Sequence, residues 1–246
     1  MGGDVDGMLE RARAAGVARF VVPGTTLADS AAAVELAGRH EDVLAAVGVH
    51  PHEAKDFEPV RDGRALEEMA RRPGVAAIGE VGLDFYYDHS PRDKQIEVLE
   101  WMLDLGKRLD LPVILHNRDS GAEMFSALER AGERERPGVF HSFTESAAYG
   151  KKALDRGYLV SFSGMITFKA AENIRSTAAA LPLTAMLVET DTPFLAPVPH
   201  RGSPCEPAYV VETAKKLAEV KGVDFPVVAE LTTASFERLF RRPHGA

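Results

Sequence analysis

The chain has 246 residues, 45% of them hydrophobic, and its 29 Lys and Arg against 37 Asp and Glu give a formal net charge of −8. This length and apolar content suit a folded domain with a substantial core and argue against a disordered chain. The acidic balance argues against nucleic-acid binding by a broad basic face, although bound metal cations can still present positive charge to a phosphate.

Cysteine usage and hydropathy restrict the expected compartment. Cys205 is the only cysteine, so no intrachain disulfide can form and a reducing compartment fits. A membrane span needs about 18 consecutive apolar residues, and no stretch of this chain reaches that length. The N-terminus lacks a signal-peptide pattern. We therefore expect a cytoplasmic monomer with no membrane partner.

Apolar runs alternate with amphipathic stretches along the whole chain. The pattern predicts seven strands, at 19–24, 43–49, 75–79, 112–115, 138–140, 158–162 and 186–188. It predicts helices at 4–16, 27–39, 63–71, 90–109, 120–131, 145–156, 169–180, 206–221 and 226–240. Asp4 is expected to cap the first helix, and Ser90 to cap the fourth with Pro91 in its first turn.

This alternation with short connections predicts a parallel sheet wrapped in helices, an α/β fold of the TIM-barrel type. No shift in composition divides the chain, so residues 1–246 are predicted to form a single domain. The predicted helices form eight layers, with the last two segments counted as one, against only seven strands, and the chain begins on a helix. Because a closed eight-stranded barrel would need a strand before Asp4, we expect the first strand to be missing from this chain.

Side chains able to bind a metal recur where the predicted strands stop. They are His50, His52, Glu80, His116, His141 and Asp191. In a barrel the carboxyl ends of all strands meet on one face, so residues far apart in sequence are expected to converge there. Mixed imidazole and carboxylate ligands suit Zn²⁺, Mn²⁺ and similar ions, and a carboxylate can bridge two of them.

Each of these residues also has an ordinary structural explanation. His50 and His52 fit a turn, His116 fits a core histidine bonded to backbone, and Asp191 alone fits an acid that caps a turn. Glu80 favours a ligand role more strongly, because a carboxylate buried without a partner is costly. Glu80, His116, His141 and Asp191 end four different strands, and the ordinary explanations would require four independent accidents on one barrel face.

For three further residues near the strand ends, the sequence indicates a functional role less strongly. Arg118 and Arg201 are suited to holding a phosphate, but exposed cations there are ordinarily solvated. Asp84 fits a hydrogen-bond partner for a histidine or arginine at the rim, and it also fits a cap for the following loop.

Motifs spread along the chain resemble the TatD family of metal-dependent deoxyribonucleases, which are barrel members of the amidohydrolase-like superfamily. The matching stretches, in order, are residues 48–52 (GVHPH), 77–84 (AIGEVGLD), 112–119 (PVILHNRD), 139–143 (VFHSF), 164–169 (GMITFK), 187–195 (LVETDTPFL), 197–202 (PVPHRG), 206–210 (EPAYV) and 232–240 (TTASFERLF). They span nearly the whole chain.

The resemblance implies a role for each strand-end residue. Glu80 would bridge two divalent ions, Mg²⁺, Mn²⁺ or Zn²⁺. His116 and His141 would bind the second ion, while Asp191 would bind the first and help to activate water. His50 would lie near the scissile phosphate. Family members begin with a strand carrying His-x-His, two ligands of the first ion, and this sequence shows no such strand, so one ion in place of two is also compatible with it.

The leading hypothesis is hydrolysis of DNA phosphodiester bonds by a metal-activated water, with an exonuclease expected. Asp191, Glu80 and His50 are the predicted catalytic residues, and Arg118, His52 and Arg201 are predicted to contact the DNA. Two alternatives remain open: a metal-dependent hydrolase of a small ester, amide or lactone on the same fold, and a catalytically impaired metal-binding homologue.

Overall fold

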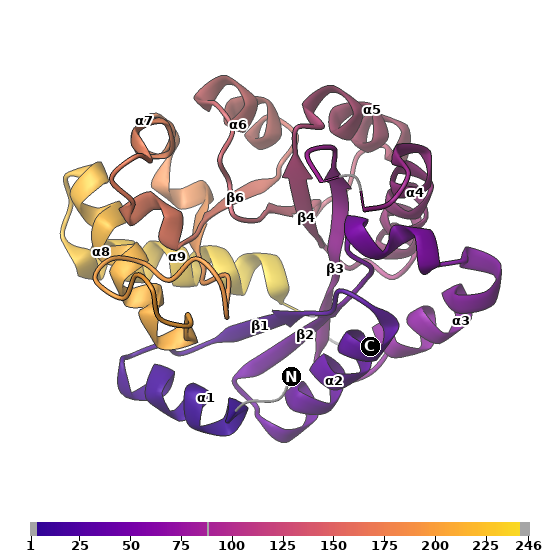
Figure 1. Cartoon of the computed structure of the whole chain (residues 1–246), viewed down its shortest axis with the longest axis horizontal. Coiled ribbons are helices and arrows are strands. Elements are labelled where there is room, and N and C mark those ends of the chain that lie inside the picture. The colour runs from indigo at the N-terminus through magenta and orange to yellow at the C-terminus, as the bar shows by residue number, and fades with distance from the viewer. Residues whose placement is uncertain (1–3, 88, 242–246) are drawn as a thin grey trace. The chain divides into compact units, whose positions relative to one another are not determined.

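The computed structural model describes residues 4–87 and 89–241 (Figure 1). Contacts between residues divide the chain into two compact units. One comprises Arg19–Phe140 and Leu239–Ala246, here called the Arg19–Phe140 unit. The other comprises Met1–Ala18 and His141–Arg238, here called the His141–Arg238 unit. That residues 1–246 form a single domain stays a prediction.

The Arg19–Phe140 unit is built on five parallel strands that pair in chain order. They are β1 (Phe20–Pro23), β2 (Val43–Val47), β3 (Val75–Asp84), β4 (Val113–Arg118) and β5 (Gly138–Phe140). Their bodies are mostly buried, although in β1 only Phe20 is, and Ile78 and Leu115 are fully enclosed. Runs of apolar residues without alternation are typical of parallel strands covered on both faces, which explains why the sequence indicated them.

Helices connect these strands, as the alternation predicted. They are α2 (Leu27–Arg39), α3 (Pro59–Ala70), α4 (Arg92–Arg108) and α5 (Gly121–Ala131), with a 3₁₀ helix η1 at Pro51–Asp56. Thr26 begins α2 by accepting a hydrogen bond from the Asp29 N–H at 3.1 Å. The helix predicted at 63–71 begins four residues earlier, because Pro59 occupies its first turn, where a missing N–H costs nothing.

Two sequence predictions in this unit are wrong. β3 does not end before Glu80 but continues to Asp84, because its second half pairs with β4, with Gly82 opposite His116 and Asp84 opposite Arg118. Glu80 and His116 therefore lie within strands. Ser90 does not cap α4. Its hydroxyl donates to the His52 carbonyl at 2.7 Å and accepts from the Lys55 N–H, so it ties η1 to the loop that precedes α4.

The His141–Arg238 unit contains two parallel strands, β6 (Leu159–Phe162) and β7 (Met186–Val188). Its α-helices are α1 (Val5–Ala14), α6 (Ala147–Leu154), α7 (Glu172–Ala180), α8 (Val210–Lys221) and α9 (Phe225–Phe240), and its 3₁₀ turns are η2 (Gly164–Thr167), η3 (Leu183–Ala185) and η4 (Pro207–Tyr209). Asp4 caps α1 by accepting from the Gly7 N–H at 2.9 Å, which confirms that prediction. The expected helix at 206–221 is η4 followed by α8.

Lys221, the last residue of α8, closes the carboxyl end of α7. Its ammonium donates to the carbonyls of Ala178, Ala179 and Leu181 at 3.2, 3.0 and 2.8 Å. A cation there satisfies carbonyls that have no intrahelical partner and lies at the favourable end of the helix dipole. Burial lowers the pKa of Lys221.

Lys221→Met is expected to lower the free energy of unfolding by about 1–3 kcal/mol, because methionine keeps the apolar stem but leaves these carbonyls without their donor. Urea denaturation monitored by circular dichroism measures the effect. Lys215→Met is the matched control. Lys215 pairs with Glu212 on the exposed side of α8, so this substitution should cost less than about 0.5 kcal/mol. Equal midpoints for the two variants would contradict the assignment.

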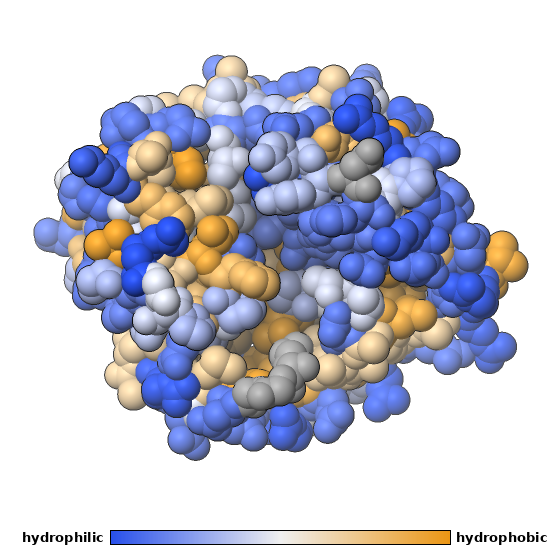
Figure 2. Space-filling model, viewed as in Figure 1, coloured by the Kyte–Doolittle hydropathy of each residue, from blue (hydrophilic) through white to orange (hydrophobic). Residues whose placement is uncertain are grey.

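Across the described residues, the helices are all too short or too polar to cross a membrane. On the face seen in Figure 2, hydrophilic residues predominate and apolar residues lie in smaller areas among them. Several large apolar side chains are nevertheless well exposed, including Val60, Tyr86, Tyr87 and Phe194. The two tyrosines are relevant to the candidate site below.

Candidate active site

Five of the polar side chains near the strand ends of the Arg19–Phe140 unit are in mutual contact. This histidine–carboxylate cluster consists of His50 and His52 around the start of η1, Glu80 and Asp84 on β3, and His116 on β4. The register of β3 against β4 brings the last three together, since residues 82–84 lie opposite residues 116–118. The cluster is mostly shielded: the side chains of His50, Glu80 and His116 are 15%, 13% and 17% exposed.

Glu80 is the carboxylate that His50 and His116 share. Its Oε1 lies 3.0 Å from His116 Nδ1 and 3.3 Å from His50 Nε2, and the two imidazole nitrogens are 3.4 Å apart. One ligand atom from each of these residues lies within 4.8 Å of the others, a spacing compatible with a single cation. The predicted convergence of these three residues is therefore observed.

Asp84 orients the other side of the cluster. Its Oδ2 accepts from His52 Nε2 at 2.8 Å and contacts His116 Nε2 at 3.2 Å. Its Oδ1 accepts from the backbone N–H groups of Tyr86 and Tyr87 at 3.1 and 3.0 Å. Both sequence alternatives for Asp84 are thus correct, because one carboxylate bonds two histidines and caps the loop after β3.

Electrostatics keep Asp84 ionised and His52 neutral. Burial acts to raise the pKa of Asp84, but the hydrogen bonds from His116, Tyr87 and His52 outweigh it and hold that pKa far below its usual range. For His52, burial is the largest cause of a lowered pKa, reinforced by His50 and His116 and opposed by the bond to Asp84. A neutral His52 with its proton on Nε2 is therefore a hydrogen-bond donor to Asp84.

The donor set of the cluster fits a divalent cation. Asp84 accepts from His116 Nε2, so the neutral ring carries its proton there and its Nδ1 lone pair faces Glu80 Oε1 at 3.0 Å. Two acceptors at that distance repel unless a proton or a cation lies between them. A carboxylate that fixes the histidine tautomer in this way is the usual support of a metal ligand.

His50 differs from His116 in its tautomer. Its Nδ1 accepts the backbone N–H of His52 at 3.2 Å, so the proton of the neutral ring is on Nε2. Although Nε2 is within ligand distance of the other groups, it is an N–H donor in that form. In this form His50 is better suited to donating a hydrogen bond to an anionic oxygen than to binding an ion.

In the His141–Arg238 unit, His141 is paired with Glu189. Glu189 Oε1 lies 3.3 Å from His141 Nδ1 and accepts the backbone N–H of Ser142 at 2.9 Å. The Ser142 hydroxyl in turn contacts that of Ser163 at 2.9 Å. By accepting from Nδ1, Glu189 fixes the His141 tautomer with its proton on Nδ1, the same kind of support that Asp84 provides to His116.

Asp191 and Arg201 lie in the loop after β7 in the same unit. Asp191 comes three residues beyond the end of β7 and is partly buried. It lies near enough to Cys205 to raise the pKa of that thiol, although burial is the larger cause. The Arg201 guanidinium stacks 3.9 Å above the Phe168 ring.

Arg118, at the end of β4 in the Arg19–Phe140 unit, is held by aromatic rings. Its guanidinium carbon lies 4.2 Å from the centre of the Tyr86 ring and 4.7 Å from that of Tyr87. The two tyrosines meet edge to face at 4.8 Å, and Tyr87 also contacts the His52 ring edge at 5.6 Å. Arg118 is therefore physically continuous with the histidine–carboxylate cluster.

The predicted site residues thus fall into two groups. The structure brings together His50, His52, Glu80 and His116, and it places Arg118 beside them. His141, Asp191 and Arg201 belong to the other unit, and their meeting with the first group stays a prediction. Sequence reasoning did not assign roles to Glu189, Tyr86 or Tyr87, although an acid and an aromatic pair directly after strands were visible signals.

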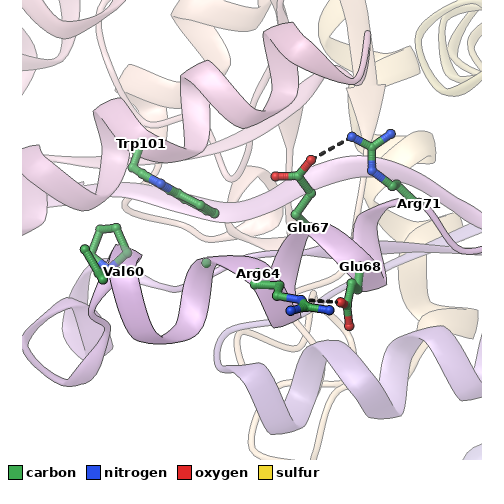
Figure 3. A pocket seen from close by; sticks show the side chains of 8 residues that line it. Val60, Arg64, Glu67, Glu68, Arg71 and Trp101 are labelled. Carbon is green, nitrogen blue, oxygen red and sulfur yellow. Dashed lines mark hydrogen bonds and ion pairs between the residues drawn. The ribbon is translucent and has the colours of Figure 1, made fainter.

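Two surface hollows contain none of the predicted site residues. One, of about 460 Å³, lies between α3 and Trp101 of α4, with Val60 at its edge (Figure 3). Its charges are paired: Arg71 with Glu67 at 2.6 Å and Arg64 with Glu68 at 2.8 Å, and Glu67 also pairs with Arg108 of α4 at 2.9 Å. The other, of about 710 Å³, lies along α2 and α3. The residues that line the two hollows include no histidine, so neither hollow has the imidazole and carboxylate groups of the histidine–carboxylate cluster. Their volume alone does not make either of them a better candidate active site.

The family profile described as "TatD related DNase" matches residues 1–241. The chain belongs to this family, whose curated relatives are named metal-dependent hydrolases. The predicted family is therefore confirmed, and the histidine–carboxylate cluster is a group of residues suited to the metal that those names imply.

Relatives and solved structures resemble the chain over nearly its whole length. The uncharacterized metal-dependent hydrolase YcfH of Escherichia coli is 40% identical over 96% of this chain and 88% of its own. YabD of Bacillus subtilis, with the same description, is 37% identical over 97% and 93%. The crystal structure of YjjV, a TatD homologue from Escherichia coli, matches with a TM-score of 0.91 and 32% identity over 98% and 93%.

A TatD family hydrolase from Entamoeba histolytica has the same fold at 18% identity, with a TM-score of 0.86 over 96% of this chain and 89% of that one. Together with the parallel strands and their connecting helices, these likenesses confirm the predicted fold class, an α/β fold of the TIM-barrel type.

Proposed function

We propose that the protein hydrolyses phosphodiester bonds of DNA with the help of one or two divalent cations. The observation that carries this proposal is the contact of Glu80 with His116 and His50. Glu80 Oε1 and His116 Nδ1 face each other with their lone pairs, and the Nε2–H of His50 lies next to them. Membership in the TatD related DNase family supports the choice of DNA as substrate.

Each residue of the cluster has a task in this proposal. Glu80 and His116 would hold the cation, which would supply Lewis-acid stabilisation of the phosphate and lower the pKa of a bound water. His50 donates its Nε2 proton in a hydrogen bond to a phosphate oxygen. His52 and Asp84 keep these rings in place. For His141 and Asp191 we propose the roles that the family resemblance implies, an ion ligand and an ion ligand that also accepts the proton of the attacking water.

A nuclease assay with labelled oligonucleotides and Mg²⁺, Mn²⁺ or Zn²⁺ tests the proposal. Wild-type protein is expected to cleave DNA with one or more of these ions and to stop when they are chelated. Asp191→Ala is expected to lower the rate by about 10²- to 10⁴-fold, the usual contribution of a positioned proton acceptor. Asp155→Asn, at the exposed end of α6, is the matched control. Full activity of Asp191→Ala would overturn its assignment, and turnover of small esters or lactones without DNA cleavage would overturn the substrate class.

Asp84→Asn tests the support of the cluster. The amide keeps the size of the carboxylate but no longer attracts the His52 and His116 N–H groups as a charge, so the affinity for Mn²⁺ should fall by about 10- to 100-fold. Isothermal titration calorimetry measures this affinity. Asp104→Asn is the control, because Asp104 pairs with Arg108 on the exposed surface of α4. Unchanged Mn²⁺ binding in Asp84→Asn would show that Asp84 serves only the loop.

A further inference from the structure

The guanidinium of Arg118 combines fixed orientation with unused hydrogen-bonding capacity. Tyr86 and Tyr87 hold it by their ring faces, at 4.2 and 4.7 Å, and the backbone carbonyl of Arg118 accepts from the Phe85 N–H. Among the residues that the structure describes, none accepts a hydrogen bond from the guanidinium. Its N–H edge is thus available to a ligand, and the planar fork of arginine suits the paired oxygens of a phosphate.

The position of Arg118 relative to the cluster follows from strand geometry. Arg118 lies two residues after His116 on β4, so both side chains leave the same face of the strand, about 6–7 Å apart along it. This separation is comparable to that of neighbouring phosphates along one extended nucleic-acid strand. If the scissile phosphate is held at Glu80 and His116, Arg118 is in register with the next one.

The rings around Arg118 are exposed although they are large. Tyr86 and Tyr87 are 58% and 42% exposed, and their loop is tied to Asp84 by the two backbone N–H groups. Asp84 thereby orients both the histidines and the loop that presents the tyrosines. In a chain with a net charge of −8, a cation that has no acidic partner among residues 4–87 and 89–241 and lies beside such a cluster is suited to an anionic ligand.

We infer that Tyr86, Tyr87 and Arg118 form a subsite for the phosphate adjacent to the scissile one, with Arg118 as the binding group and the tyrosines as positioning residues. This inference rests on the proposed function. It implies that the enzyme selects substrates with at least two consecutive phosphates, so that a dinucleoside monophosphate, with a single phosphodiester, cannot use the subsite.

The experiment compares hydrolysis of a dinucleoside monophosphate with that of a ten-nucleotide oligothymidylate. For the oligonucleotide, Arg118→Ala is expected to raise KM by about 10- to 100-fold with little change in kcat, which is the size of one charge-assisted bidentate contact. The loss in kcat/KM should be at least about ten times larger for the oligonucleotide than for the dinucleoside monophosphate. Equal losses on the two substrates would overturn the inference by placing Arg118 at the scissile phosphate, and no loss on either would show that it contacts no phosphate.

Substitutions of Tyr86 and Arg118 test whether the tyrosine ring positions the Arg118 guanidinium or only contributes to packing. Tyr86→Phe keeps the ring face and should retain the oligonucleotide KM, whereas Tyr86→Leu should raise it by about 2- to 10-fold. Arg118→Lys keeps the charge but loses the planar fork, so it should resemble Arg118→Ala more than wild type. Arg92→Ala is the matched control: Arg92 stacks on the Phe85 ring of the same loop at 4.5 Å and is exposed, so its loss removes one charge nearby but not the subsite. A Tyr86→Leu KM equal to that of wild type would contradict the positioning role.

A binding measurement without catalysis makes the two proposals separable. Fluorescence anisotropy of the labelled oligonucleotide in EDTA reports affinity independently of turnover. Removing one phosphate contact should reduce the slope of log K against log salt by about 0.7. If wild-type protein cleaves neither substrate, the proposed function fails. If it cleaves DNA while Arg118→Ala changes neither this slope nor the preference for the longer substrate, only the subsite fails.

Discussion

Glu80→Gln is expected to abolish tight metal binding and to lower metal-dependent hydrolysis by about 10²- to 10³-fold or more. The amide has the size of the carboxylate, so packing within β3 is retained while the negative charge facing His116 and His50 is lost. Calorimetric titration with Mn²⁺ measures the affinity. A thermal melt measures the linked effect, since a ligand that binds only the folded state raises the Tm of wild type but should not raise that of the variant.

Glu97→Gln is the matched control for this substitution. Glu97 is 54% exposed on α4, where it pairs with Lys94, and losing its charge should leave both the Mn²⁺ affinity and the Tm shift as in wild type. A Glu80→Gln protein that binds Mn²⁺ as tightly as wild type would show that the contact between Glu80 and His116 is structural and does not hold a cation.

Gly82→Ala is expected to lower the free energy of unfolding by more than about 3 kcal/mol, toward the upper end of the range for substitutions that overpack a core. A Cβ at this position would lie 1.9 Å from the carbonyl oxygen of His116 on the neighbouring strand. Because that atom is backbone, β3 and β4 must separate to admit the methyl group, which also displaces His116. Urea denaturation gives the loss of stability, and the Mn²⁺ affinity is expected to fall with it.

Gly38→Ala provides the opposite control. Gly38 lies in α2, and a Cβ there would have no heavy atom within 4 Å. Alanine favours the helical conformation over glycine, so this variant should be as stable as wild type or more stable by up to about 1 kcal/mol. A Gly82→Ala protein as stable as Gly38→Ala would mean that the two strands are not held as closely as the structure places them.

The secondary structure and the chemistry of the candidate site were largely accessible from the sequence. The strands at 138–140 and 186–188 and the helix at 27–39 have the predicted bounds, since apolar runs and helical periodicity are local signals. A predicted strand boundary was wrong where pairing with a distant strand extends the element beyond its apolar run. The apolar run at 75–79 indicated a strand that stops before Glu80, whereas pairing with β4 carries β3 on to Asp84.

The sequence by itself determined the residue types of this site and the kind of fold that delivers them, because a parallel α/β chain places its strand ends together whatever their spacing along the chain. Only the tertiary structure decided which groups touch. The contacts of Asp84 with His52 and His116, and of Arg118 with Tyr86, depend on the register of β3 against β4 and on a loop conformation, and neither is encoded in any short stretch. A shift of one residue would turn these side chains to the opposite face of the sheet, so the site exists only once the long-range pairing has formed.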